Sequence, residues 1–137
     1  MVDLAKYDTT EASDRGARMQ MYLPNGDIAE GSFVVLLGPD SEVARKQERA
    51  RQQALIDRAS ATRGKAPKLS ADEMAERSLA ELVDLTVRFE GIEIDGEDVG
   101  ADKDAIRSAY ERHRWLADDA RMFIQDRANF FPSASGS

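Results

Sequence analysis

The sequence predicts an α+β fold, in which an N-terminal β-hairpin or small antiparallel sheet packs on a mainly α-helical body of three to four helices. The hairpin is indicated by ARMQMYL (17–23), which alternates apolar and polar residues like a half-buried strand, and by the β-rich run SFVVLL (32–37). Asn25-Gly26 lies between them and suits a tight turn. The helices are indicated by strong helix formers and capping signals beyond residue 40. Because two strands alone are marginal in water, we expect the hairpin over 17–37 to pack on the helices.

The domain organisation follows from length and composition. A chain of 137 residues fits one domain. We expect a single α+β domain over 16–131, preceded by a flexible polar arm over 1–15 and followed by a disordered tail over 132–137. The expected helices span about 41–63, 70–89, 102–113 and 115–129.

The first expected helix, 41–63, combines a thin apolar stripe with concentrated positive charge. Its apolar residues are few, so it is either solvated on most sides or completed by a partner. The segment from Arg45 to Lys68 holds eight basic and two acidic residues, a net +6, whereas the whole chain carries −7, so the rest carries −13. We expect this segment to meet an acidic surface, either in the same or a neighbouring copy or on an acidic protein partner.

The second expected helix, 70–89, begins with a capping box formed by Ser70 and Glu73. Apolar residues recur at three- and four-residue steps through Thr86 and Phe89, and Gly91 is expected to end the helix. The stretch 92–100 then alternates isoleucines with acids around Asp95-Gly96, which predicts a short strand or hairpin. Asp102 is expected to cap the helix over 102–113.

The aromatic C-terminus, RANFF (127–131), allows two interpretations. Trp115, Phe130 and Phe131 either close the core or form an exposed patch for a partner. Phe131 continues a helical stripe through Leu116 and Ile124, so we expect it to seal the helices. Phe130 falls off that stripe and is the candidate contact for a partner.

The sequence shows no catalytic, metal-binding or cofactor-binding residues. It has no cysteine, and its one histidine, His113, is flanked by Arg112 and Arg114, so no Ser–His or Cys–His nucleophile is indicated. The acidic loop 90–104 fails the EF-hand pattern, because a loop starting at Asp95 has Val99 and Ile106 where oxygen ligands are required. We therefore expect a protein that works by binding, with no enzymatic activity.

Charge and hydropathy exclude other partners. A net charge of −7 disfavours general binding to nucleic acid or anionic membranes, and no aromatic residue is interleaved in the basic segment to stack on bases. No apolar run could span a bilayer, and the N-terminus lacks the pattern of a signal peptide. These features predict a cytosolic protein.

The candidate partner-binding residues fall into three groups: a face of the hairpin, the basic helix and the C-terminal aromatics. Methionine on the hairpin suits a surface that must accept varied side chains. The candidates are Met19, Met21, Phe33, Val35, Arg45, Arg49, Trp115 and Phe130.

The order of these segments resembles the small tail assembly chaperones of long-tailed bacteriophages. The resemblance covers residues 15–131 and depends on VRFEGIEIDGE (87–97), on Tyr110 before Trp115-Leu116, and on DRANFF (126–131). Two departures concern prolines. The stretch VGADKD stands where the family often has a proline-containing segment, and an arginine precedes the tryptophan where a proline is common.

The resemblance implies a non-enzymatic chaperone that binds the phage tape-measure protein and keeps it soluble until the tail tube polymerises. It also implies contact with the tail-tube protein, self-association, a place in the host cytoplasm and absence from the mature virion. Some family members are also made in a longer, frameshifted form. The alternatives are a minor structural or head–tail completion protein of the virion, an acidic inhibitor of a host nucleic-acid enzyme, and a metal-dependent enzyme. The basic segment counts against the inhibitor.

Overall fold

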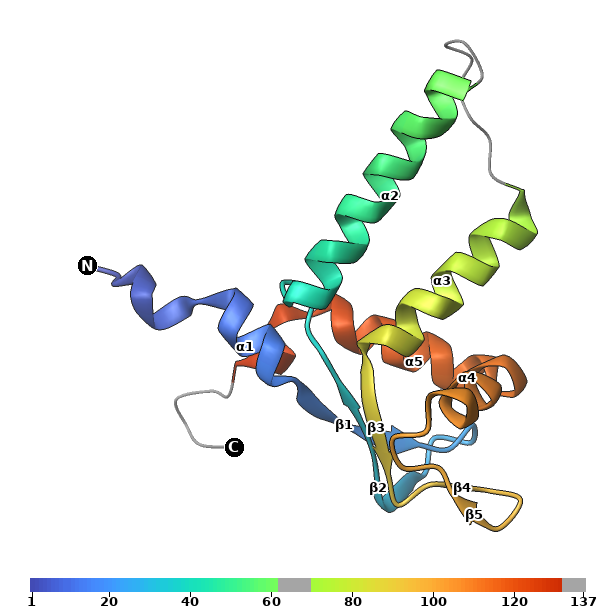
Figure 1. Cartoon of the computed structure of the whole chain (residues 1–137). Helices are drawn as coiled ribbons and strands as arrows, with labels where there is room; N and C mark the ends of the chain where they lie inside the picture. Colours follow the sequence, from blue (N-terminus) through green and yellow to red (C-terminus); the bar gives the residue numbers. More distant parts are fainter. Residues whose placement is uncertain (62–69, 132–137) are drawn as a thin grey trace.

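A three-stranded antiparallel sheet lies at the centre of the computed structural model, which describes residues 1–61 and 70–131 (Figure 1). Its strands are β1 (Ala17–Tyr22), β2 (Ile28–Leu36) and β3 (Thr86–Glu90), with β2 in the middle. Strands β4 (Glu93–Ile94) and β5 (Glu97–Asp98) form a separate two-stranded sheet. The predicted α+β class with an N-terminal hairpin is confirmed.

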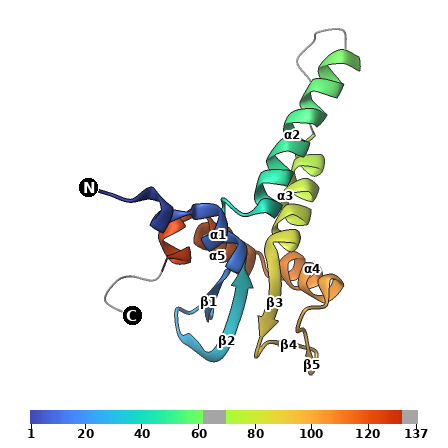
Figure 2. The same ribbon diagram turned by 60° about the vertical axis from the view of Figure 1, so that its left-hand side comes forward.

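The helices occupy two regions. Helices α4 and α5 pack near the sheet, whereas α2 and α3 run side by side away from it and form a helical arm (Figures 1 and 2). The helical segments are η1 (Leu4–Tyr7), α1 (Thr9–Arg15), α2 (Glu42–Ala61), α3 (Ala71–Leu85), α4 (Lys103–Arg112), α5 (Arg114–Gln125) and η2 (Arg127–Phe130), where η marks a 3₁₀ helix.

Several local signals are confirmed. Gly26 has a φ of +91° in the hairpin turn, and the backbone N–H of Asp27 donates to the side chain of Asn25 at 3.0 Å. The Ser70 hydroxyl accepts from the N–H of Glu73 at 3.1 Å, and Asp102 caps α4. The end of the first helix beyond residue 61 and the tail over 132–137 lie outside the described residues.

The predicted apolar face of the hairpin is wrong. Met19 lies opposite Val34 in the β1–β2 pair and is buried in the core, whereas Phe33 lies opposite Gln20 and Val35 opposite Arg18. Residues directly opposite each other in a sheet point to the same side. Phe33 and Val35 therefore lie on the same face of the sheet as Arg18, and Met19 lies on the opposite face. The pairing register places Met19 of β1 on the same face as Val34 of β2 and not on the face of Phe33.

The predicted helix 70–89 ends at Leu85, and Thr86 begins strand β3. Thr86 and Phe89 are buried as expected, but Phe89 pairs with Val34 of β2 instead of continuing the helical stripe. The edge of β2 offers backbone hydrogen bonds to a segment rich in β-branched and aromatic residues, and this pairing overrides the helical spacing. Gly91 follows at the end of β3, where an added Cβ would meet the carbonyl oxygen of Gly31 at 2.2 Å.

The prediction of a flexible arm over 1–15 is wrong for residues 9–15, which form α1. Asp8 caps this helix, and Ala12 and Ser13 are buried. The Ser13 hydroxyl accepts from the N–H of Asp40 at 3.2 Å, and its carbonyl accepts from the N–H of Gly38 at 2.9 Å. The helix docks through hydrogen bonds rather than an apolar stripe, so hydrophobic periodicity did not reveal it.

The C-terminal helix is shorter than predicted. Helix α5 ends at Gln125, and the side chain of Asp126 accepts from the N–H of Ala128 at 3.0 Å to begin η2. This break changes the direction of the following side chains. Phe130 is buried with 4% exposure and meets the Phe123 ring edge-on at 5.6 Å, whereas Phe131 is only partly buried. The expectation that Phe131 seals the core and Phe130 stays free is therefore wrong.

Candidate partner-binding surface

Helix α2 is held against α3 by polar contacts. None of its 20 residues is buried. The Gln47 side chain donates to the carbonyl oxygen of Glu81 at 2.9 Å, and Arg51 forms an ion pair with the Glu81 carboxylate. Farther along the arm, Arg58 pairs with Glu73 at 2.6 Å. A long helix with so little apolar burial leaves much of its surface available to a partner.

A groove of about 580 Å³ lies between α2, α3 and α5. We call it the arm groove. Its apolar part includes Leu82 and Leu85 of α3 and Ile124 of α5, each less than 9% exposed. The other lining residues are Pro39, Ala44, Arg45, Gln47, Glu48, Arg49, Arg51, Ser78, Glu81, Arg121 and Gln125.

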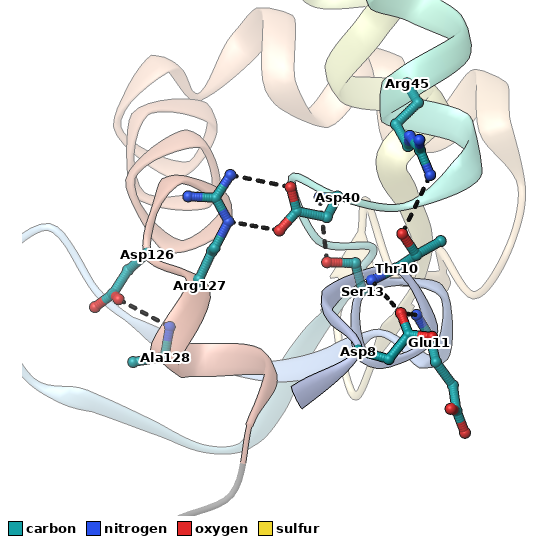
Figure 3. Close-up of polar contacts among 9 residues, drawn as sticks. All are labelled: Asp8, Thr10, Glu11, Ser13, Asp40, Arg45, Asp126, Arg127 and Ala128. Carbon is teal, nitrogen blue, oxygen red and sulfur yellow. Dashed lines mark hydrogen bonds and ion pairs between the residues drawn. The ribbon is translucent and has the colours of Figure 1, made fainter. Parts of the chain in front are cut away.

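The arm groove keeps an excess of positive charge. Two of its four arginines are already paired, since Arg51 contacts both acids of the groove and Arg121 lies 3.6 Å from Asp118. Among residues 1–61 and 70–131, Arg45 and Arg49 have no carboxylate within 4 Å. Arg45 instead donates to the Thr10 hydroxyl at 3.2 Å (Figure 3). Arg45 also helps to lower the pKa of the Asp40 carboxyl, whereas no such interaction is found for Arg49 among the described residues, so Arg49 is the more available of the two cations to a negatively charged partner.

Three exposed apolar side chains extend the groove along the arm. Leu55, Ile56 and Met74 are 47%, 59% and 57% exposed. Residues four apart on a helix share a face. Leu55 follows the groove residue Arg51 by four positions, and Met74 precedes the groove residue Ser78 by four.

Ile56 lies on the same side of α2, because it follows the groove residue Arg49 by seven positions, or about two turns. We call Leu55, Ile56 and Met74 the arm strip. By this helical spacing, the arm strip lies on the groove side of α2 and α3, with its exposed apolar side chains farther from the body than the groove arginines.

The root of α2 is fixed by two distant segments (Figure 3). Asp40, in the turn before α2, accepts from the Arg127 guanidinium of η2 at 3.0 Å, and its N–H donates to Ser13 of α1. The hydrogen bond from Arg127 lowers the pKa of the Asp40 carboxyl below its usual value. These contacts orient α2 relative to the body, together with Val43 and Ala44, which are only partly buried but pack against the hydrophobic core.

The structure separates the residues predicted to bind a partner. Arg45 and Arg49 lie together in the arm groove. The remaining candidates lie elsewhere: Met19, Val35 and Phe130 are buried, and Met21, Phe33 and Trp115 are partly buried.

The outer face of the sheet is covered by charged side chains. The Arg18 guanidinium lies 4.0 Å from the centre of the Phe33 ring and pairs with Glu90 at 2.9 Å. Arg88 pairs with the same carboxylate, so Val35, opposite both Arg18 and Arg88, is only 6% exposed. This face is therefore not an open apolar surface.

Sequence reasoning missed the arm strip and the α5 side of the groove. The sequence does contain a signal for Ile56 and Met74. Ile56 lies two helical turns after Arg49 in the basic helix over 41–63, and Met74 lies one turn before Ser78 in the capped helix over 70–89. Arg121 and Ile124 were not, because only the packing of α5 beside the arm brings them there. A smaller apolar patch, also missed, lies at the end of the hairpin, where Tyr22 pairs with Ile28 and both are exposed.

The described part of the chain contains no group of three or more histidine or acidic side chains placed to hold a metal ion. The acids of the 90–104 loop serve local structure: Asp95 forms the β4–β5 turn with φ of +52°, and Asp102 caps α4. His113 lies between α4 and α5, with its ring 6.0 Å from that of Trp115. Within residues 1–61 and 70–131, no helix is both long and apolar enough to cross a membrane.

No family model, curated protein or solved structure matches this chain.

Proposed function

We propose that this protein is a non-enzymatic phage tail assembly chaperone that binds the helical tape-measure protein and keeps it soluble until the tail tube polymerises. The observation that carries the proposal is the helical arm, on which the exposed apolar side chains of the arm strip lie next to the groove between α2, α3 and α5. Such a surface suits the docking of an amphipathic helix, a common mode of peptide recognition. A long helical client offers many such segments.

The remainder of the chain suits a carrier of an aggregation-prone client. Its net charge of −7 favours solubility, and its described surface carries many ion pairs. The resemblance of residues 15–131 to tail assembly chaperones supplies the identity of the client. The proposal includes action in the host cytoplasm and absence from the finished virion, with the tail-tube protein as a further partner.

Co-expression with the long helical tape-measure protein tests this function. We expect the long protein to be soluble and to co-purify with this chain, and to be insoluble when expressed alone or with an unrelated acidic protein of the same size. Equal insolubility in the presence and absence of this chain would refute the proposal. Quantitative mass spectrometry of purified particles separates a chaperone, which should be absent, from a structural protein, which should be present in fixed copy number.

A further inference from the structure

We propose that the arm groove and the arm strip bind one acidic, amphipathic helix of the client. This inference depends on the proposed function and specifies the surface and the chemistry of the segment bound. The occupant has aliphatic side chains on one face and carboxylates beside that face.

The apolar residues of the groove and the strip are aligned along the arm. Leu82, Leu85 and Ile124 line the groove near the body, and Leu55 with Met74 continue the same side of the arm outward. From the groove residue Ala44 to Ile56 the axis of α2 rises by about 18 Å, at about 1.5 Å per residue. A docked helix of about 12 residues, or three turns, would cover this length.

The positive charge of the groove indicates an acidic occupant. Among the described residues, neither Arg45 nor Arg49 of the groove has a carboxylate within 4 Å, and only Arg45 has a longer-range interaction with an acid, Asp40, although the chain as a whole carries −7. An acidic segment is repelled by most of this protein and attracted to these two side chains. Charge complementarity therefore fixes where the segment docks and speeds its encounter.

The chemistry of the surface favours a protein helix over nucleic acid. The residues that line the groove include no aromatic side chain, and the exposed apolar side chains beside it are aliphatic or methionine. Single-stranded nucleic acid is bound by aromatic side chains that stack on bases. Methionine and leucine instead suit the apolar face of a helix.

Overlapping 25-residue peptides that span the tape-measure protein test the inference by fluorescence anisotropy. We expect binding by peptides with net negative charge and a helical apolar stripe. Arg45→Glu/Arg49→Glu should weaken their binding at least about tenfold. Arg112→Glu/Arg114→Glu, which changes two exposed arginines outside the groove and alters the net charge by the same amount, is the control for net charge and should leave binding nearly unchanged.

The arm strip is tested by two variants and one control. Ile56→Ser and Met74→Ser should each weaken binding of the acidic peptides, whereas Met122→Ser, at an even more exposed methionine of α5 that does not line the groove, should not. Circular dichroism of each variant checks that the fold is kept. A photocrosslinking residue at Gln125, in the groove, should capture an acidic peptide, and the same residue at Glu97, in β5, should not.

The outcomes distinguish this inference from the function. If the full-length client binds but the arginine and strip variants bind it as tightly as the wild type does, the groove is not the site, and the proposed function stands. If only basic or neutral peptides bind, the acidic occupant is refuted. If Arg45→Glu/Arg49→Glu changes the oligomeric state of the isolated chain in sedimentation, the occupant is a second copy. If the client does not bind at all, the function fails and this inference fails with it.

Discussion

Arg127 donates to both carboxylate oxygens of Asp40, which lies 87 positions earlier in the chain. The pair connects the last 3₁₀ helix to the turn from which α2 begins (Figure 3). In the helical arm, α3 is anchored by the buried Leu82, Val83 and Leu85, whereas α2 has no buried residue and is held by contacts at its root and with α3. This pair is the longest-range ion pair of the described residues.

The Asp40–Arg127 pair predicts a dependence of stability on pH. Arg127 lowers the pKa of Asp40 below its usual value of 3.8, so the pair stabilises the folded state at pH values above the unfolded pKa. That stability is lost as the pH falls through the folded pKa. We expect Asp40→Asn to lower the free energy of unfolding in urea at pH 7, and this difference from the wild type to shrink at pH 3.

Asp119→Asn is the control for that measurement, because Asp119 is an exposed residue of α5 for which no ion pair is found among the described residues. It should leave stability near the wild-type value at pH 7. If Asp40→Asn lowers the free energy of unfolding by the same amount at pH 7 and at pH 3, the ionised carboxylate of Asp40 does not stabilise the fold.

Phe130 and Phe131 should differ strongly in their contribution to stability. Phe130 is 4% exposed and packs edge-on against Phe123, so Phe130→Ala leaves a cavity and should cost about 3–5 kcal/mol of unfolding free energy. Phe131→Ala removes a partly exposed ring and should cost clearly less. Urea unfolding followed by circular dichroism measures both. Equal costs would mean that the burial of Phe130 does not hold in solution.

The buried pair of Thr86 and Tyr110 should respond unequally to loss of either hydroxyl. The Thr86 hydroxyl donates to the carbonyl oxygen of Leu82 at 2.8 Å and lies 2.8 Å from the Tyr110 hydroxyl. Tyr110→Phe leaves the first hydrogen bond intact and should cost about 0.5–1.5 kcal/mol. Thr86→Val removes the hydrogen-bond partner of both the Leu82 carbonyl oxygen and the Tyr110 hydroxyl, and should cost more, about 1–3 kcal/mol.

A double-mutant cycle checks this pair. The combined variant should cost less than the sum of the two single substitutions, because the second change removes a hydroxyl that has already lost its partner. Additive costs, measured by urea unfolding, would show that the two hydroxyls do not interact.

Two N-terminal truncations test the docking of α1. Removal of residues 1–7, all exposed, keeps the Asp8 cap and should leave the melting temperature within about 2 °C of the full chain. Removal of residues 1–15 also removes Ser13 and its hydrogen bonds to Gly38 and Asp40, and should lower the melting temperature by more than about 4 °C. Equal melting temperatures would restore the interpretation of a flexible arm.

Local chemistry made several elements predictable. The Asn25-Gly26 turn, the Ser70 and Asp102 caps and the Asp95-Gly96 turn each depend on residues within a few positions of one another. The sequence alone reveals such signals, because the side chains that hydrogen-bond to the backbone N–H groups lie within a few positions of them.

The candidate site was predictable only in part. Arg45 and Arg49 were expected to meet a partner from the charge of their segment, and they lie in the arm groove. Met19 and Phe33 were expected on one face of the hairpin, but the strand register places them on opposite faces. Register depends on which residues of two strands pair, and alternation within each strand does not specify it.

The sequence by itself determined the fold class, the turns and caps, the lack of thiol chemistry and the concentration of positive charge in the α2 region. Only the tertiary structure decided that Thr86 and Phe89 form a strand, that Phe130 rather than Phe131 is buried, and that α5 completes a groove with α2 and α3. The physical reason is the range of the interactions. The hydrogen bonds of caps and turns form between residues a few positions apart. Strand pairing, core packing and the groove instead require segments far apart in the chain to meet.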